Sequence, residues 1–178
     1  MDYTLLIFYA TLALGVSFLC SILEAVVLSM PHTHIAVMQK EKSKIGTMWS
    51  KLKDDDAVRP LTAILTLNTI AHTMGAAGVG SQVQILYGEE ALTVASIILT
   101  LAVLFLSEII PKTLGTAYWK QLAPVSGHIL SLMTSALAII IVPIQWLKAI
   151  MPKGSQSLVT RDDVAALADL GEEEGIHD

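Results

Sequence analysis

Long stretches of apolar residues constrain this chain more than any other feature. One runs from residue 3 to 30, a second from about 60 to 86 and a third from 91 to 118. Each exceeds the roughly 20 residues that a helix needs to cross a bilayer. Only 15% of the residues are charged, against about 25% in soluble domains. The sequence predicts an all-α membrane protein with three transmembrane helices per subunit.

The distribution of Lys and Arg predicts the orientation. Six of the eleven lie between residues 40 and 59, and none lies before residue 40 or between 60 and 111. Cytoplasmic loops are enriched in these residues. We therefore expect a multi-pass protein of the cell membrane, with its N-terminus and the turn at residues 87 to 90 outside and its C-terminus in the cytoplasm.

A fourth apolar region, from about residue 120 to 151, is interrupted by Pro124, Gly127 and Pro143. Lysines flank it on both sides, so both of its ends are expected in the cytoplasm. About 30 residues are too few for two full crossings. The sequence predicts a kinked juxtamembrane belt helix at the inner interface, and a fourth crossing is the alternative.

The remainder, residues 155 to 178, is polar and acidic. Thr160 is a plausible helix N-cap, because two aspartates follow it in the first turn. We expect a transmembrane domain over residues 1 to 154, followed by the start of an acidic cytosolic helical bundle. Because the chain stops just after this acidic stretch, a further soluble part is expected beyond it.

Polar side chains recur inside the apolar runs. Glu24, Asn68 and Glu108 each lie about six to eight residues from the cytoplasmic end of their run, or roughly 9 to 12 Å deep. Ser17, Ser21 and Glu24 share one helix face. An ionisable residue in hydrocarbon costs at least about 2.5 kcal/mol and usually marks a pathway or site. We expect the three helices to bring oxygen ligands to one level.

Pro111 is predicted to break the third helix. It has no N–H, so the carbonyl of Ser107 would lose its helical partner. Unwound carbonyls carry partial negative charge and can coordinate a cation. Carboxylate, amide, hydroxyl and carbonyl oxygens together suit magnesium, calcium or sodium, and composition alone does not choose among them.

Each polar residue also has a purely structural interpretation. Glu24 and Asn68 would join helices by hydrogen bonds, and the serines would bond to their own helix. Glu108 and Lys112, four residues apart, would form a pair within one helix. His72 is more typical of a satisfied interior histidine than of a ligand. No motif of a hydrolytic enzyme is present, so neither catalysis nor a nucleic-acid partner is expected.

Small residues recur at four-residue spacing in the second run, at Ala71 and Gly75 and again at Ala76 and Gly80. This spacing lets helix backbones approach closely. The second helix is therefore expected at the centre of the bundle or at a dimer interface. Three helices are few to enclose an ion path, which favours a homo-oligomer.

Three segments, "FLCSILEAVVLS", "LTLNTIAHT" and "LSEIIPKTLG", resemble the transmembrane domain of the CorB/CorC and CNNM magnesium-transport proteins. The resemblance implies a homodimer in the lipid bilayer, with three spans per subunit and a belt helix. It implies export of Mg²⁺ from an inward-facing site in exchange for Na⁺. ATP would act only through cytosolic CBS domains, which this chain lacks. A magnesium sensor or regulatory membrane subunit without transport is the alternative.

The same resemblance implies a set of metal-site residues by motif position. Ser21, Asn68 and Glu108 match the ion-site positions of the family. Glu24, Ser29 and Pro111 also fall on motif positions, and freed backbone carbonyls from Pro111 to Gly115 would complete the shell.

Overall fold

The computed structural model describes residues 2 to 152, and every regular element in that range is helical. The prediction of an all-α protein is confirmed for this part of the chain. Two compact units are present, residues 1 to 145 and residues 146 to 178. The predicted acidic segment at residues 155 to 178 lies outside the described residues.

Two long apolar segments have the length and composition of membrane spans. The first comprises α1 (Thr4–Thr11), the π-helical η1 (Leu12–Val16) and α2 (Ser17–Ser29). The second comprises η3 (Glu89–Ala91), α6 (Leu92–Ala102), the π-helical η4 (Val103–Ile109) and α7 (Ile110–Ala117). Both agree closely with the first and third predicted runs, and they make the chain a multi-pass membrane protein.

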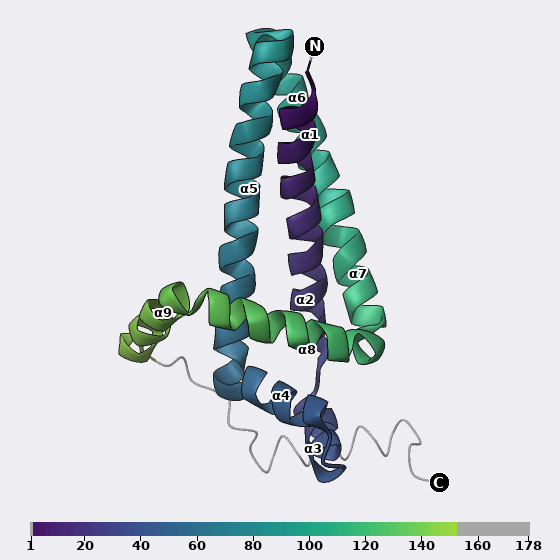
Figure 1. Ribbon diagram of the computed structural model, residues 1–178, viewed down its shortest axis with the longest axis vertical. Coiled ribbons are helices and arrows are strands. Elements are labelled where there is room, and N and C mark those ends of the chain that lie inside the picture. The colour runs from purple at the N-terminus through teal and green to yellow at the C-terminus, as the bar shows by residue number, and fades with distance from the viewer. Residues whose placement is uncertain (1, 153–178) are drawn as a thin grey trace, which may run out of the picture. The chain divides into compact units, whose positions relative to one another are not determined.

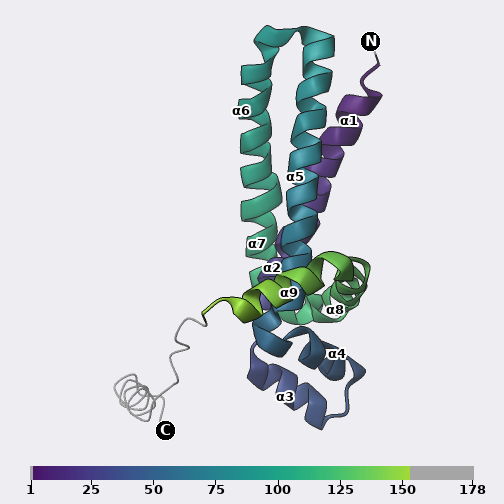
Figure 2. The ribbon, with the colours of Figure 1, turned by 90° about the vertical axis from the view of Figure 1, so that its left-hand side faces the viewer.

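The second predicted run forms α5 (Val58–Tyr87), a single helix of 30 residues. It is less apolar than the two candidate spans and is not among them. It runs antiparallel to both and lies beside them in Figures 1 and 2. A Cβ on Gly75 would lie 2.5 Å from the Cβ of Ala13, and one on Gly78 would overlap the ring of Tyr9. Small residues therefore let α5 pack closely against the first span.

This close packing uses only one of the two small-residue pairs noted in the sequence. Ala71 and Gly75 are buried against the first span. Gly80 has open space where a Cβ would be, and Ala76 is exposed. The pair at Ala71 and Gly75 thus supports the central position of the second helix.

The basic loop after the first span folds into α3 (His32–Lys40), α4 (Lys44–Leu52) and the short 3-10 turn η2 (Asp54–Ala57). Trp49 of α4 is fully buried, and its Nε1 donates a hydrogen bond to the carbonyl of Ala123, 2.8 Å away. Gly127 faces the same indole, because a Cβ there would lie 3.0 Å from Nε1. These contacts dock α4 on α8 (Trp119–Ala136).

The fourth apolar region forms α8 and α9 (Ala138–Ile150), which meet at an angle of 84°. The bend falls at Leu137, whereas Pro124 and Pro143 lie inside the two helices. The region is thus bent, but not at either proline, and the belt helix at the inner interface stays a prediction. Taken as one broken span, this pair would be a third candidate crossing, and by length and composition alone it can equally be re-entrant.

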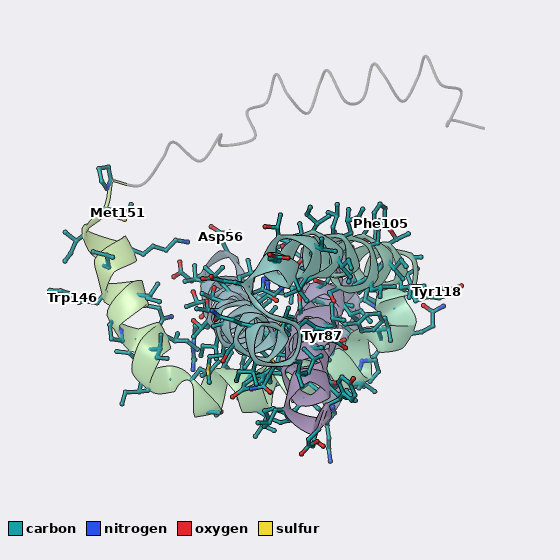
Figure 3. All side chains as sticks on the ribbon, turned by 90° about the horizontal axis from the view of Figure 1, so that it is seen from above. Asp56, Tyr87, Phe105, Tyr118, Trp146 and Met151 are labelled. Atoms are coloured by element: carbon teal, nitrogen blue, oxygen red, sulfur yellow. The ribbon has the colours of Figure 1, made fainter. Side chains whose placement is uncertain are left out.

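The ends of the long helices differ in what surrounds them. The N-terminus and the turn at Gly88 lie at one end, and α3, α4 and α8 lie at the other (Figures 1 and 2). Phe105 and Tyr118 project from the periphery of the helices in Figure 3, and both are about half exposed. Ser17 and Ser107, two of the polar side chains inside the spans, are buried.

Candidate functional site

A cluster of polar side chains joins the first span, α5 and the third run. We call it the polar layer. Hydrogen bonds and ion pairs link five of its members, Ser17, Glu24, His72, Glu108 and Lys112. We also assign Ser21 and Asn68 to it, because they lie one helical turn from Ser17 and His72.

Glu108, at the end of η4, is the centre of this layer. Its Oε1 accepts a hydrogen bond from the Ser17 hydroxyl at 3.4 Å and lies 4.0 Å from Nε2 of His72. That same Nε2 lies 2.7 Å from the Oγ of Ser17. The three residues come from three separate helices, and Ser17 is fully buried. The helices are therefore joined by polar contacts at the depth of Glu108.

Lys112 connects two carboxylates on different helices. Its Nζ lies 3.0 Å from Oε2 of Glu108 and 3.7 Å from Oε2 of Glu24. The predicted pair of Glu108 and Lys112 within one helix is confirmed, but it is not confined to that helix. The lysine side chain is 43% exposed and that of Glu108 25%. The ammonium group of Lys112 thus lies between two carboxylates from different helices.

Ser21 and Asn68 fall one helical turn closer to α8. The helices α2 and α5 are antiparallel, and Ser17 of α2 contacts His72 of α5. Ser21 follows Ser17 by four residues and Asn68 precedes His72 by four, so both lie one turn from that contact in the same direction. Ser21 is buried. The Oδ1 of Asn68 is also buried, and it is the only buried side-chain oxygen or nitrogen in the described residues without a hydrogen-bond partner.

An amide oxygen in that position is energetically unusual. Leaving a buried acceptor unsatisfied costs about 1 to 3 kcal/mol, and such groups call for a specific explanation. A purely structural asparagine that joined two helices would have its oxygen bonded across the interface. The geometry of Asn68 therefore disfavours the structural interpretation of this residue.

Two π-helical stretches flank the layer, and sequence reasoning missed both. They are η1, directly before Ser17, and η4, which contains Glu108. The Ser107 hydroxyl of η4 donates to the carbonyl of Leu14 in η1 at 2.8 Å. Wide helical turns of this kind are rare and occur often at functional sites. The only hint in the sequence was Pro111, which follows η4.

The predicted break at Pro111 is wrong in this structure. The helix widens before the proline, where the Ile110 N–H donates to the Phe105 carbonyl five residues back, and α7 then continues through residue 117. The missing proline N–H is accommodated by this change of helical register. No unwound carbonyls occur between residues 111 and 115.

Gly115 has a clear packing role. A Cβ at this position would lie 2.7 Å from the Cβ of Ala25 and 2.8 Å from the carbonyl of Ile22. It lets α7 approach α2 closely, beside Ser21 and Glu24. Ser29 is half buried at the end of α2, and no hydrogen bond or ion pair joins it to the polar layer.

His72 and Lys112 were noted in the sequence but not assigned to the site, and Ser17 was noted only as a neighbour. Their positions were visible in the pattern, since Ser17 is four residues before Ser21 and His72 four after Asn68. The sequence does not specify how each helix is rotated about its own axis. That rotation turns both residues toward Glu108.

A cavity of about 360 Å³ adjoins the layer between the three helices. Glu108 and His72 are its ionisable members. The full lining comprises Ala13, His72, Ala76, Leu99, Thr100, Val103, Leu104 and Glu108. The carboxylate of Glu108 thus borders an open hollow at the surface of the three helices rather than packed side chains alone.

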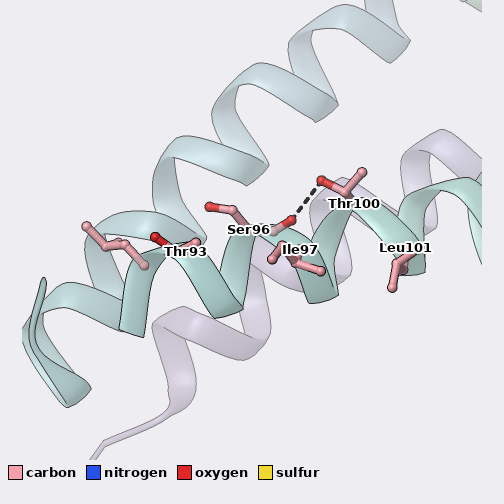
Figure 4. Close-up of a pocket in the computed structure, with 6 residues that line it drawn as sticks. Thr93, Ser96, Ile97, Thr100 and Leu101 are labelled. Carbon is pink, nitrogen blue, oxygen red and sulfur yellow. Dashed lines mark hydrogen bonds between the residues drawn. The ribbon is translucent and has the colours of Figure 1, made fainter. Parts of the chain in front are cut away.

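A larger groove of about 460 Å³ follows α6 (Figure 4). All its lining residues belong to that one helix, and none is ionisable. The hydroxyl of Thr100 donates to the carbonyl of Ser96 at 2.7 Å. The groove therefore offers no convergent polar groups and is a weaker candidate than the polar layer.

The donor types in the polar layer define which ions it suits. The described residues contain no group of three or more His, Cys, Asp or Glu side chains arranged to hold a metal. A cation here would therefore depend on hydroxyl and amide oxygens beside one or two carboxylates. Oxygen ligands of this kind suit hard cations.

Comparisons with known proteins identify the family to which the chain is similar. The family model described as "Cyclin M transmembrane N-terminal domain" (CNNM) matches residues 8 to 178. A Synechocystis protein described as "UPF0053 protein sll1254" is 27% identical over 175 residues, which is 96% of this chain and 48% of that protein. The chain spans about half the length of this curated relative.

Proposed function

The chain belongs to the CNNM transmembrane-domain family, and on this premise we propose that it is the membrane part of a magnesium transporter. Mg²⁺ is the transported substrate, and the polar layer is its binding site. Transport is outward and coupled to Na⁺. The polar layer lies nearer the end of the spans where α8 begins, and we place that end in the cytoplasm.

One observation supports this proposal above the others: the Oδ1 of Asn68 is buried without a partner, one turn from a carboxylate cluster. A hard cation supplies the missing partner of the amide oxygen. Mg²⁺ takes few protein ligands and keeps part of its water shell. A half-exposed site with one amide, one hydroxyl and two carboxylates fits that preference.

The residues divide into three roles. Asn68 and Ser21 contribute neutral oxygen ligands, and Glu108 and Glu24 contribute negative charge. Lys112 neutralises both carboxylates when no ion is bound and swings toward solvent when Mg²⁺ arrives. Ser29 and the backbone carbonyls from Pro111 to Gly115 are not part of the proposed site, because the carbonyls lie within the helix α7 and Ser29 makes no polar contact with the layer.

The membrane arrangement completes the proposal. α5 is the third span, because its 30 residues match the length of the other two and it packs between them. The bent pair of α8 and α9 lies at the inner interface as a belt. The working unit is a homodimer in the lipid bilayer, with the N-terminus outside and the C-terminus in the cytoplasm.

Calorimetric titration with MgCl₂ tests the binding site. Asn68→Ala and Glu108→Gln are each expected to weaken Mg²⁺ binding at least about ten-fold, equivalent to roughly 1.4 kcal/mol. Thr69→Ala is the matched control, because Thr69 is exposed on the same helix and its hydroxyl bonds the carbonyl of Leu65. Wild-type affinity in both site variants would reject the polar layer as the binding site.

Flux into proteoliposomes separates transport from sensing. Vesicles that contain the protein are loaded with a Mg²⁺-sensitive dye, and a Na⁺ gradient is imposed. Flux that depends on Na⁺ and is lost in Asn68→Ala supports the transporter. Binding by calorimetry without flux in wild-type protein would instead support a magnesium sensor or regulatory subunit.

A further inference from the structure

We propose that a cationic cavity between α4, α5 and α8 binds the phosphate group of an anionic membrane lipid. The cavity measures about 370 Å³. No residue of the polar layer lines it, and the proposal does not depend on magnesium transport. Nine residues from the three helices line it, and we call this cavity the basic pocket. Three of the nine carry a positive charge.

The positive charges converge from two helices. Lys44 and Lys51 lie seven residues apart on α4, so they share one face of that helix. Arg59 lies in the first turn of α5. All three line the basic pocket. Arginine offers a planar set of donors that matches phosphate oxygens, and lysine adds a mobile point charge.

In the part of the chain that the structure describes, these charges are not neutralised by ion pairs. Within residues 2 to 152, no ion pair involves Lys44, Lys51 or Arg59. The aspartates at residues 54 to 56 precede α5 but do not line the pocket. Lys53 is different, because its Nζ donates to the carbonyl of Val27 at 2.9 Å. Lys53 thus hydrogen-bonds within the protein, whereas Lys44, Lys51 and Arg59 are available to bind a ligand.

The walls of the pocket are held firmly. The hydrogen bond from Trp49 to the carbonyl of Ala123 ties α4 to α8, and Gly127 allows their close contact. Hydroxyls of Ser131, Thr134 and Ser135 form the α8 wall, and each donates to a backbone carbonyl of α8. The cationic side chains therefore supply the attraction, and the helices supply a preformed shape.

The surface beside the pocket favours a lipid over a soluble phosphate. Leu132 lies next to Ser131 on α8 and is 72% exposed, and Val125, seven residues earlier on the same face, is 61% exposed. Exposed apolar side chains thus lie on the helix that forms one wall of the cationic cavity. Phosphate beside acyl chains is the chemistry of an anionic phospholipid, and juxtamembrane basic clusters attract such lipids.

Native mass spectrometry of the detergent-solubilised chain tests this proposal. Phosphatidylglycerol or phosphatidylcholine with matched acyl chains is added at equal concentration. The wild-type protein is expected to retain phosphatidylglycerol in preference. The double variant Lys51→Gln/Arg59→Gln is expected to bind it roughly 30-fold more weakly, from two basic residues near the lipid phosphate.

The control removes the same charge elsewhere in the loop. Lys40→Gln/Lys42→Gln changes two exposed lysines that do not line the pocket, and it is expected to retain phosphatidylglycerol like the wild type. Equal losses in both double variants, or none in either, would overturn the proposal. Displacement of the lipid by millimolar inorganic phosphate would overturn the lipid assignment in favour of a soluble phosphate anion.

Discussion

The polar layer and the interface of α4 with α8 differ in whether their buried polar atoms have hydrogen-bond partners. At the interface, Trp49 is fully buried and its indole N–H has one well-placed acceptor. In the layer, the side chains of Glu108 and Lys112 are partly exposed, and the buried Oδ1 of Asn68 has no partner. The interface thus excludes solvent and its indole N–H is hydrogen-bonded, whereas the polar layer is partly exposed and one of its buried acceptors has no hydrogen-bond partner.

This difference separates a structural contact from a candidate site. Satisfied polar groups in a packed interface stabilise one arrangement. Partly exposed charges with alternative partners allow more than one arrangement, as Lys112 does between Glu108 and Glu24. Substitutions at the interface should therefore change stability, and substitutions in the layer should change ion binding.

The largest effect is expected from Trp49→Ala. Removing a buried Trp typically costs about 3 to 5 kcal/mol, and here it also leaves the Ala123 carbonyl without its donor. Thermal unfolding in detergent should show a strong loss of stability, while the Mg²⁺ affinity of the folded fraction stays unchanged. Trp119→Ala is the control, because Trp119 is only half buried. A weakened Mg²⁺ affinity would contradict the separation of the two regions.

Lys112→Met is expected to tighten Mg²⁺ binding about five-fold. Ion pairs of this exposure contribute at most about 1 kcal/mol, and the lysine competes with Mg²⁺ for Glu108 and Glu24. Calorimetric titration measures the effect, with Lys120→Met as the matched control outside the layer. Weaker binding in Lys112→Met would mean that the lysine positions the carboxylates instead of competing for them.

Ser107→Ala should lower stability by about 0.6 kcal/mol, the mean value for a hydrogen bond between membrane helices. It removes the only donor to the Leu14 carbonyl from the neighbouring span. Thr113→Ala is the matched control, since the Thr113 hydroxyl bonds to its own helix. Equal midpoints of unfolding for the two variants would show that the two π-helical stretches are not held together by this bond.

The smallest effect concerns Lys53, which lies outside the spans. Burial lowers the pKa of its amine, and Asp56 opposes that change. Between the lowered pKa and the ordinary value, the unfolded chain binds more protons than the folded one, so stability rises with pH. As the pH rises toward the ordinary lysine pKa of about 10, the wild type should gain stability relative to Lys53→Met. A parallel pH dependence of the two midpoints would refute this.

Much of the fold could be predicted from the sequence alone. The bounds of the spans follow from the lengths of the apolar runs, and the structure places helix ends within a few residues of them. The shared face of Ser17, Ser21 and Glu24 follows from helical spacing. The bend at Leu137 could not be predicted, because neither proline nor glycine marks it.

The sequence by itself determined that the chain is helical, that it enters a membrane and that costly polar residues interrupt its apolar runs. Those are properties of single helices, set by hydropathy and by the rise per residue. Only the tertiary structure decided which polar residues meet. The close packing of Gly75 and Gly115 fixes the rotation of each helix, and that rotation brings His72 to Ser17 and Lys112 to both carboxylates. Hydropathy does not encode such rotations, because they arise from contacts between residues far apart in the chain.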